Sequence, residues 1–165
     1  MDIEPCTHED FLTIVRDLED FWGTDRARAV HHPMWVHEFG DTAWVVREGD
    51  RVIAYLFAFW SQSEPVGYVH LVGVRRSHQR RGIGRMLYER FETIARERGC
   101  VALKAITPPI NADSIAFHRR LGFSLLGESN EEGIPVVPDY FGPGVPRVVF
   151  VKTLHDPSGE TGLTD

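Results

Sequence analysis

The segment from Val72 to Leu87 concentrates residues that could bind an anion. It follows an apolar, strand-like run and places Gly82 and Gly84 at the start of a helical pattern. Glycines let backbone N–H groups approach a ligand, and the first turn of a helix adds unsatisfied N–H donors and the positive end of the helix dipole. Six of the 18 basic residues, all arginines, lie in the sixteen positions from 75 to 90. The segment predicts a phosphate site, with glycines that serve only the turn as the alternative interpretation.

Two common phosphate-binding patterns do not fit this segment. A dinucleotide fingerprint needs a third glycine where the chain has Leu87, and a P-loop needs a Gly-Lys-Ser/Thr triplet that the sequence lacks. The run from Gln79 to Gly84 instead has the form Q/R-x-x-G-x-G/A, directly after a strand that ends in Val-x-Val. In this respect the chain resembles the GCN5-related N-acetyltransferase (GNAT) superfamily.

A second motif supports the same resemblance. The run from Asn111 to Phe123 is similar to the family's N-x-x-A/S-x-x-F-Y-x-x-x-G-F, with His118 where the family has tyrosine. The two motifs occur in the family's order and spacing, and the resemblance covers about residues 1 to 154. It implies an acetyl-CoA-dependent N-acetyltransferase that transfers an acetyl group to a primary amine. Acetyl-CoA would be the cosubstrate, and no metal is expected.

The resemblance also implies which residues contact acetyl-CoA. The end of the strand would bind the pantetheine arm through its backbone, the arginine-rich turn would surround the pyrophosphate, and Asn111 would be reached by the pantetheine region. Phe117 would pack against either the cofactor or the core. The full predicted set is Val72, Gly73, Val74, Gln79, Arg80, Arg81, Gly82, Ile83, Gly84, Arg85, Asn111 and Phe117.

Attack of a neutral amine on a thioester needs a base for the ammonium proton and donors for the carbonyl oxygen, and it gains from an acid for the thiolate. Strand alternation places Tyr68 and His70 on one face together with Val72 and Val74. His70 matches a strand histidine of one family member, serotonin N-acetyltransferase, so it is the candidate base. A histidine satisfied within the sheet is the alternative.

His118 stands at the position of the acid in many family members. It could donate a proton near neutral pH, or it could be a polar helix residue beside the cofactor sulfur. Neither Cys6 nor Cys100 has the sequence context of a nucleophile, so we expect direct attack in a ternary complex.

The acceptor amine would be bound by parts of the chain that are rich in aromatic residues. These are the region from Phe21 to Phe39, the end of the apolar run from Val52 to Trp60, and the loop from Val136 to Val145. We expect substrate contacts from Trp35, Phe59, Trp60, Asp139 and Tyr140, with Asp139, Glu38 or Glu128 able to hold a cation. The composition of these regions favours a small-molecule amine with an apolar or aromatic body.

The periodicity of apolar residues predicts the elements that position these side chains. Strands are expected at residues 3–6, 42–47, 52–60, 66–75, 100–106, 123–126 and 147–154. Helices are expected after Thr7, from Gly82 to Gly99 and from Asn111 to about Arg120, whereas residues 21–39 are expected to be loop and short helix near the surface. The predicted fold is α/β: a single domain with a mixed, mostly antiparallel sheet and helices on both faces. The resemblance adds a splayed, V-shaped cofactor cleft.

Length and composition limit the remaining possibilities. The 165 residues suit one domain at 1–154 and a flexible tail at 155–165, since the last residues lack an apolar pattern. The net charge of −6 disfavours a nucleic-acid or anionic-membrane partner, and the longest apolar run is nine residues, so we expect no membrane span. With no export signal visible, we expect a cytoplasmic enzyme. A homodimer is a possible assembly. The histidines at 31, 32 and 37 lack metal-ligand spacing, so no metal is assigned.

Two other functions remain open at this point. A CoA-binding sensor without catalysis would explain why a histidine replaces the tyrosine of the second motif. A protein or peptide N-terminal acetyltransferase would share the cofactor motifs and differ only in its acceptor.

Overall fold

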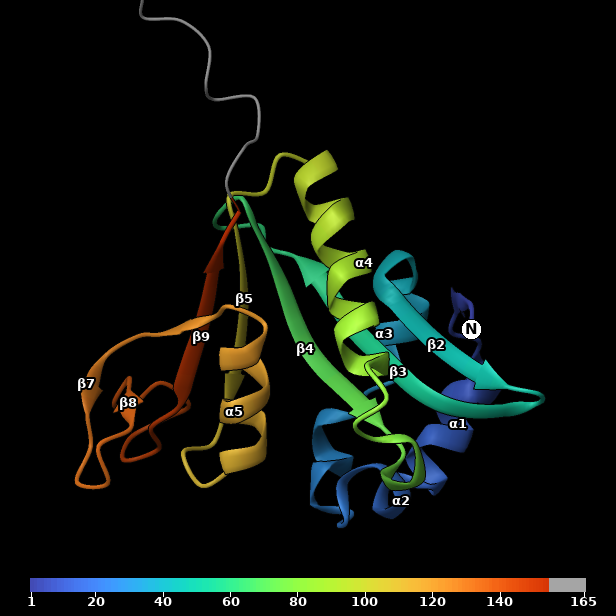
Figure 1. The fold of residues 1–165 in the computed structure, drawn as a ribbon, viewed down its shortest axis with the longest axis horizontal. Coiled ribbons are helices and arrows are strands. Elements are labelled where there is room, and N and C mark those ends of the chain that lie inside the picture. The colour runs from blue at the N-terminus through green and yellow to red at the C-terminus, as the bar shows by residue number, and fades with distance from the viewer. Residues whose placement is uncertain (155–165) are drawn as a thin grey trace, which may run out of the picture. The chain divides into compact units, whose positions relative to one another are not determined.

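The computed structural model describes residues 1–154, whose ribbon is drawn in Figure 1. Its contacts divide into two compact units. The first consists of Met1–Trp60 and Tyr68–Phe91, and the second of Ser61–Gly67 and the chain from Glu92 onward. The tail predicted at 155–165 lies outside the described residues.

The chain alternates helices and strands in an order close to the predicted one. The helices are α1 (His8–Arg16), α2 (Leu18–Trp22), α3 (Met34–His37), α4 (Ile83–Glu97) and α5 (Ala112–Arg120), with short 3₁₀ turns η1 (Arg26–Val30), η2 (Gly40–Thr42) and η3 (Arg76–His78). The strands are β1 (Ile3–Pro5), β2 (Ala43–Glu48), β3 (Arg51–Trp60), β4 (Val66–Val74), β5 (Ala102–Thr107), β6 (Ser124–Leu125), β7 (Glu128–Ser129), β8 (Pro135–Val136) and β9 (Val148–Thr153).

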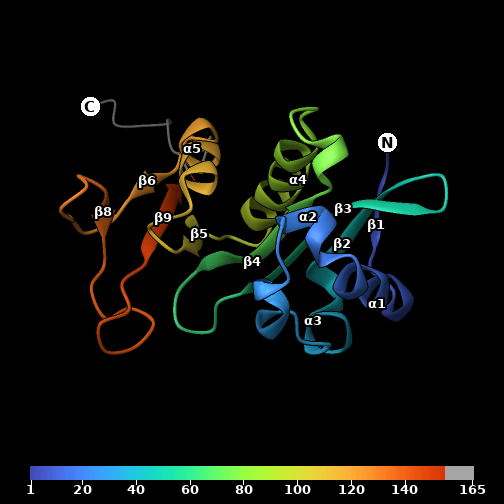
Figure 2. The same ribbon diagram turned by 90° about the horizontal axis from the view of Figure 1, so that it is seen from below.

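In the first unit, helices cover both faces of the strands β1-β2-β3-β4, which lie side by side in that order. The pairs β1–β2 and β2–β3 are antiparallel. The ring of Phe91 on α4 contacts Trp44 of β2 on one face, while Phe11 of α1 contacts Phe57 of β3 on the other. Figure 2 shows α4 on one side of these strands and α1 and α3 on the opposite side. The alternation of β3 side chains therefore builds two apolar layers.

The start of α1 shows how a local signal fixes an element. Thr7 and Asp10 form a capping box, in which each side chain accepts the other's backbone N–H. Asp10 is 5% exposed, and Arg47 of β2 donates two hydrogen bonds of 2.7 Å to its carboxylate. The helix is thus capped and also tied to the sheet.

In the second unit, β5, β9 and β6 lie side by side in that order as antiparallel neighbours. Helix α5 begins at the predicted cap, since Asn111 Oδ1 accepts the N–H of Ser114 at 3.1 Å. The ring of His118 on α5 stacks on Phe150 of β9, so the helix packs on this strand. The small antiparallel pair β7–β8 was not predicted from the sequence.

The predicted fold class is confirmed: the structure is a mixed α/β fold with mostly antiparallel strands. The expectation that residues 21–39 lie near the surface is wrong in part, because His31 is 6% and Trp35 is 3% exposed. Among the described residues, no helix is long and apolar enough to cross a membrane. The single domain and the V-shaped cleft stay predictions.

Candidate active site

His70, the predicted base, lies half-buried on β4 of the first unit. Its ring stacks on the indole of Trp35 with 4.3 Å between centroids and 22° between planes. Its Nε2 lies 3.3 Å from the carbonyl oxygen of Val30. Burial lowers the pKa of His70 below its ordinary value, and the Val30 contact opposes this only in part. The ring is therefore neutral at pH 7, as a base must be.

The other ring nitrogen of His70, Nδ1, has no hydrogen-bond partner among the described residues. The described part of the chain also holds no fully buried side-chain nitrogen or oxygen without a partner. Nδ1 must therefore keep some accessible surface. A neutral imidazole with one free, reachable nitrogen can accept a proton.

Side-chain burial alternates along β4 from Tyr68 to Val74, with the even-numbered residues partly exposed. Tyr68 stacks on Phe59 of β3 at 4.9 Å, whereas Gly73 lies directly over Tyr55. The common face predicted for Tyr68, His70 and the valines at 72 and 74 stays a prediction.

Gly73 is a glycine because no Cβ fits there. An added Cβ would lie 2.5 Å from the Tyr55 ring. Tyr55 itself is fully buried, accepts a hydrogen bond from Trp22 Nε1 at 2.6 Å, and donates to His31 Nε2 at 2.7 Å. The Nδ1–H of His31 donates to Ala27, so both nitrogens of this histidine are occupied. His31 therefore has a structural role, because it connects Tyr55 to the carbonyl of Ala27.

The predicted acceptor residues of the first unit lie in or beside one aromatic cluster. Phe59 contacts Phe39 at 5.8 Å and Trp35 at 6.0 Å, so aromatic rings connect Phe59 to the ring that holds His70. Phe59 and Trp60 line an open pocket of about 400 Å³ whose other lining residues are His37, Glu38, Phe39, Gly40, Asp41 and Thr42. Trp35 lies in the core and does not line this pocket.

The arginine-rich turn is anchored to the core by its first arginine. Arg75 is 1% exposed and donates to Asp17 and Asp20, at 2.7 Å each, and its Nε donates to a carbonyl of β3 at 2.6 Å. Its guanidinium also lies over the Phe21 ring at 4.5 Å. Arg75 thus belongs to the structure of the turn, although the sequence grouped it with the five arginines at 76, 80, 81, 85 and 90, which are exposed.

The turn that follows has the backbone expected of an anion cradle. Arg80 and Gly82 have positive φ values of 63° and 79°, and the space where Gly82 would carry a Cβ is open. Met86 donates its N–H to the carbonyl of Gly82, so the N–H groups at 83 and 84 lie in the first helical turn, ahead of the first intrahelical acceptor. Gln79 uses its side chain to donate to the carbonyl of Val74. These residues fit a diphosphate held by backbone donors.

In the second unit, the side chains of the second motif are engaged in the fold. Asn111 caps α5, and His118 Nδ1 lies 2.8 Å from the carbonyl oxygen of Ser114. His118 is 4% exposed and stacks on Phe150 at 4.0 Å and 8°. Burial lowers its pKa to about 4. A ring that is neutral and hydrogen-bonded at pH 7 is poorly suited to act as an acid, which favours the structural interpretation of His118. Phe117 is half-buried beside it.

The predicted acceptor loop of the second unit is ordered by its own backbone. Asp139 has a φ of 54° and accepts the N–H of Gly144 with Oδ1 at 2.6 Å, so one carboxylate oxygen already holds the loop. Tyr140 and Phe141 are 44% and 59% exposed, and Arg147 lies over the Phe141 ring. Glu128 is exposed on β7.

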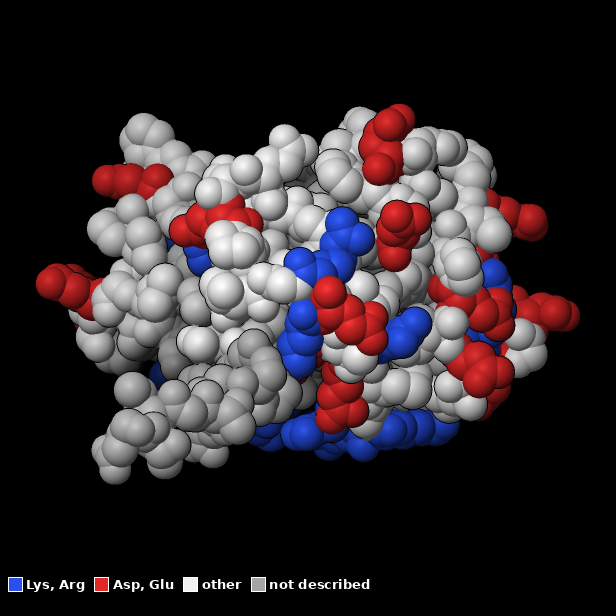
Figure 3. Space-filling model, turned by 90° about the horizontal axis from the view of Figure 1, so that it is seen from above, with Lys and Arg blue, Asp and Glu red and all other residues white. Residues whose placement is uncertain are grey.

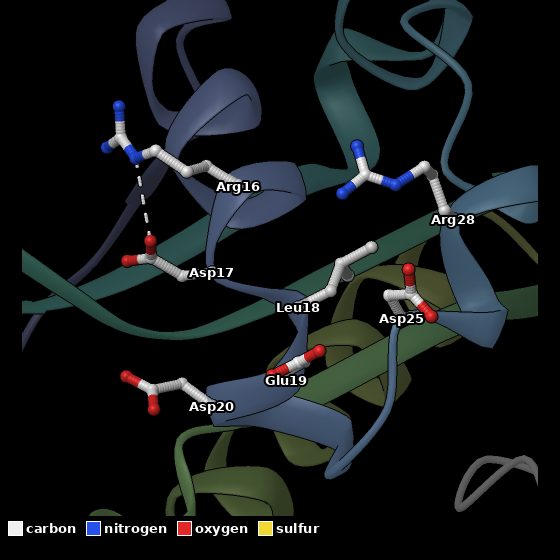
Figure 4. A pocket seen from close by; sticks show the side chains of 7 residues that line it. All are labelled: Arg16, Asp17, Leu18, Glu19, Asp20, Asp25 and Arg28. Atoms are coloured by element: carbon white, nitrogen blue, oxygen red, sulfur yellow. Dashed lines mark ion pairs between the residues drawn. The ribbon is translucent and has the colours of Figure 1, made fainter.

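An acidic pocket lies where α1 meets α2, but its side chains are partly occupied. The pocket has a volume of about 340 Å³. Figure 4 shows its lining residues, Arg16, Asp17, Leu18, Glu19, Asp20, Asp25 and Arg28. Asp17 and Asp20 already bind Arg75.

Figure 3 shows acidic and basic side chains interspersed on the face it displays, so the net charge of −6 does not form a continuous acidic field there.

Neither cysteine is suited to covalent catalysis. Burial raises the pKa of Cys6 to about 12 and also raises that of Cys100. Among residues 1–154, no three His, Cys, Asp or Glu side chains are grouped closely enough to hold a metal.

Comparison with known proteins identifies the class of this protein. The sequence profile described as "Acetyltransferase (GNAT) family" matches residues 9–123, more than half of the chain. The chain therefore belongs to the GNAT family of acetyltransferases. A search of curated proteins found no match.

Solved structures share the fold at low sequence identity. Ard1 from Thermoplasma volcanium has a TM-score of 0.74 and 15% identity, covering 94% of this chain and 98% of its own. The ribosomal-protein-S18-alanine N-acetyltransferase from Escherichia coli has a TM-score of 0.68 and 14% identity, covering 98% and 99%. An aminoglycoside 6'-N-acetyltransferase solved with coenzyme A has a TM-score of 0.65 and 17% identity, covering 96% and 100%. At these identities the likeness concerns the fold.

Proposed function

We propose that this chain acetylates the primary amine of a small molecule with an apolar or aromatic body, by direct attack within a ternary complex. The observation that carries the proposal is His70, a neutral histidine with a free Nδ1 that lies against an aromatic cluster. When bound, acetyl-CoA supplies a thioester carbonyl carbon that an amine can attack. The residues from Arg80 to Arg85 would hold the diphosphate through backbone N–H groups, and His70 would take the ammonium proton.

The pocket beside Phe59 supports an aromatic or apolar amine as the acceptor. Phe39, Phe59 and Trp60 give it an apolar wall, and Glu38 and Asp41 add two carboxylates without a Lys or Arg in the lining. Such a pocket would attract an ammonium group and pack a planar body. Of the three predicted cation-holding residues, Glu38 is the one that lines this pocket. One carboxylate oxygen of Asp139 instead accepts a hydrogen bond from Gly144 in its own loop.

A screen of amines tests this proposal. Purified protein and acetyl-CoA would be offered aryl-alkyl amines, amino acids, aminoglycosides and peptides with free N-termini, and the release of free thiol would be measured. We expect release with aryl-alkyl amines. Release with peptides alone would assign the chain to N-terminal acetylation and contradict the proposal.

A second candidate is a CoA-binding sensor that does not turn over. It is favoured by His118, which replaces the motif tyrosine with a neutral, buried and hydrogen-bonded ring. The same screen separates the two, because tight CoA binding in calorimetry together with no thiol release from any amine would identify a sensor. We favour the enzyme, since a thiolate leaves without an acid far more easily than an alkoxide does.

A further inference from the structure

One carbonyl group organises the surroundings of His70. The backbone oxygen of Val30, at the end of η1, lies 3.3 Å from His70 Nε2 and 3.3 Å from Trp35 Nε1. A carbonyl oxygen only accepts hydrogen bonds, and the indole nitrogen only donates. Nε2 of the neutral His70 ring must therefore carry its hydrogen for this contact to be a hydrogen bond, which leaves the lone pair on Nδ1.

Trp35 constrains the same ring from its face. It is 3% exposed, stacks on His70 at 4.3 Å, and is itself packed against Phe39 and Phe59. Because it is buried behind this ring, it does not offer an open surface to a substrate. We propose that Trp35 is a positioning residue that, together with the Val30 carbonyl, holds His70 as the Nε2–H tautomer so that Nδ1 is the proton-accepting atom. This inference rests on the proposed function of His70 as the base.

The proton and electron balance of the step follows from this arrangement. One proton of the ammonium group moves to His70 Nδ1, which turns the ring into an imidazolium. The amine lone pair then forms the bond to the thioester carbonyl carbon, and the C–S bond breaks with its electron pair on sulfur. The nitrogen loses its second proton, the thiolate takes one proton to become a thiol, and the other proton is released to water from His70.

Two titratable groups of the same cluster, His31 and Tyr55, do not compete for this proton. His31 is the ionisable group whose charge is coupled to His70, and both of its nitrogens are hydrogen-bonded to Ala27 and Tyr55. Burial lowers the pKa of His31, and burial raises that of Tyr55 well above its ordinary value. Both groups are therefore neutral when His70 accepts a proton.

The tautomer can be measured without any activity. Long-range ¹H–¹⁵N correlation spectra distinguish a protonated Nε2 from a protonated Nδ1, and a pH titration of the same signals gives the pKa of His70. We expect the Nε2–H tautomer in the wild-type protein and a pKa below 6.5. A dominant Nδ1–H tautomer would overturn the inference even if acetyl transfer were found.

Two variants of Trp35 and one control make the test specific. Trp35→Leu removes the ring and its N–H, so we expect a mixture of tautomers, a higher pKa for His70, and a fall of about tenfold in kcat with little change in the KM for acetyl-CoA. Trp35→Phe keeps a stacked ring and should recover most of this loss. Trp44→Leu removes another buried tryptophan, on the α4 face, and should lower stability without moving the His70 signals.

Each outcome of these experiments decides a separate question. If His70 keeps its tautomer and pKa in Trp35→Leu while that variant remains folded by circular dichroism, Trp35 does not position the ring. If wild-type protein transfers no acetyl group in the amine screen, the proposed function fails, and the spectra still decide whether Trp35 orients His70.

Discussion

His70 and His118 occupy the two positions at which the sequence predicts acid–base chemistry, and their surroundings differ. Both rings stack on an aromatic side chain, and burial lowers the pKa of both. His118 is 4% exposed and its Nδ1 is bound to the Ser114 carbonyl, whereas Nδ1 of His70 has no partner among the described residues. A motif therefore gives a residue's location, while its hydrogen bonds decide what it can do there.

The largest expected effect is the loss of the strand histidine. His70→Ala removes the proposed base, so kcat/KM with an aryl amine of low pKa should fall by about 100-fold or more. The KM for acetyl-CoA should stay within about twofold, because the ring does not hold the cofactor. Steady-state kinetics measure both values, and a variant with near wild-type kcat/KM would contradict the role of His70.

The next effect concerns the phosphate turn, where Gly82→Val would place a side chain in the space the diphosphate needs. We expect the Kd for CoA to rise about tenfold, or about 1.4 kcal/mol, in calorimetry. Gly99→Val is a matched control, since Gly99 also has a positive φ of 76°, against 79° for Gly82, and open space at its Cβ. Gly82→Val and Gly99→Val should lower the thermal stability of the protein to a similar extent. An equal loss of CoA affinity in both would show that the turn does not bind the phosphates.

A smaller effect is expected in the pocket beside Phe59. Glu38→Gln removes one of its two carboxylates, so the KM for a cationic aryl amine should rise by about fivefold, or about 1 kcal/mol, with kcat unchanged. Glu128→Gln removes an exposed carboxylate on β7 and should leave the KM unaltered. Equal effects of the two substitutions would indicate general charge attraction rather than a pocket.

His118 should matter for stability and little for the reaction. The pKa of His118 falls from 6.5 in the unfolded chain to about 4 in the folded one. The contribution of the neutral ring to the free energy of unfolding is therefore complete above about pH 6.5 and is lost as the pH falls toward 4. In urea unfolding at several pH values, His118→Phe should weaken the pH dependence of the free energy of unfolding. The same substitution should change kcat less than about threefold. A wild-type alkaline limb that disappears in His118→Phe, with a lower rate at the pH values where His118 is protonated, would instead identify His118 as an acid.

The smallest effect is expected from the cysteines. Cys100→Ser should change kcat/KM less than about twofold, because the raised pKa of this thiol leaves little thiolate at pH 7. Double-reciprocal plots for the two substrates should intersect, as direct transfer requires. Parallel lines together with inactivity of Cys100→Ser would establish a covalent intermediate.

Elements with local signals could be predicted from the sequence. The capping residues Thr7 and Asn111 and the long apolar run of β3 fixed helices and strands near their observed bounds. The strands β7 and β8 were missed because two residues each are too short to show a period. The phosphate turn at Arg80 and Gly82 could also be predicted, because its residues form a contiguous motif.

The parts that could not be predicted depend on contacts between distant residues. Arg75 is anchored by Asp17 and Asp20, which lie more than 50 positions earlier, so the sequence grouped it with the exposed arginines. The contact between His70 and the Val30 carbonyl spans 40 positions.

The pH dependence of kcat/KM for wild-type protein and His70→Gln, measured with an aryl amine of low pKa, tests the account most directly. Such an acceptor stays neutral over the range studied, so the acidic limb reports the enzyme's base. We predict that the kcat/KM of the wild-type protein decreases at acidic pH with an apparent pKa below 6.5. We also predict that this acidic limb disappears in His70→Gln. An unchanged acidic limb in His70→Gln would show that another group removes the proton and would contradict the account.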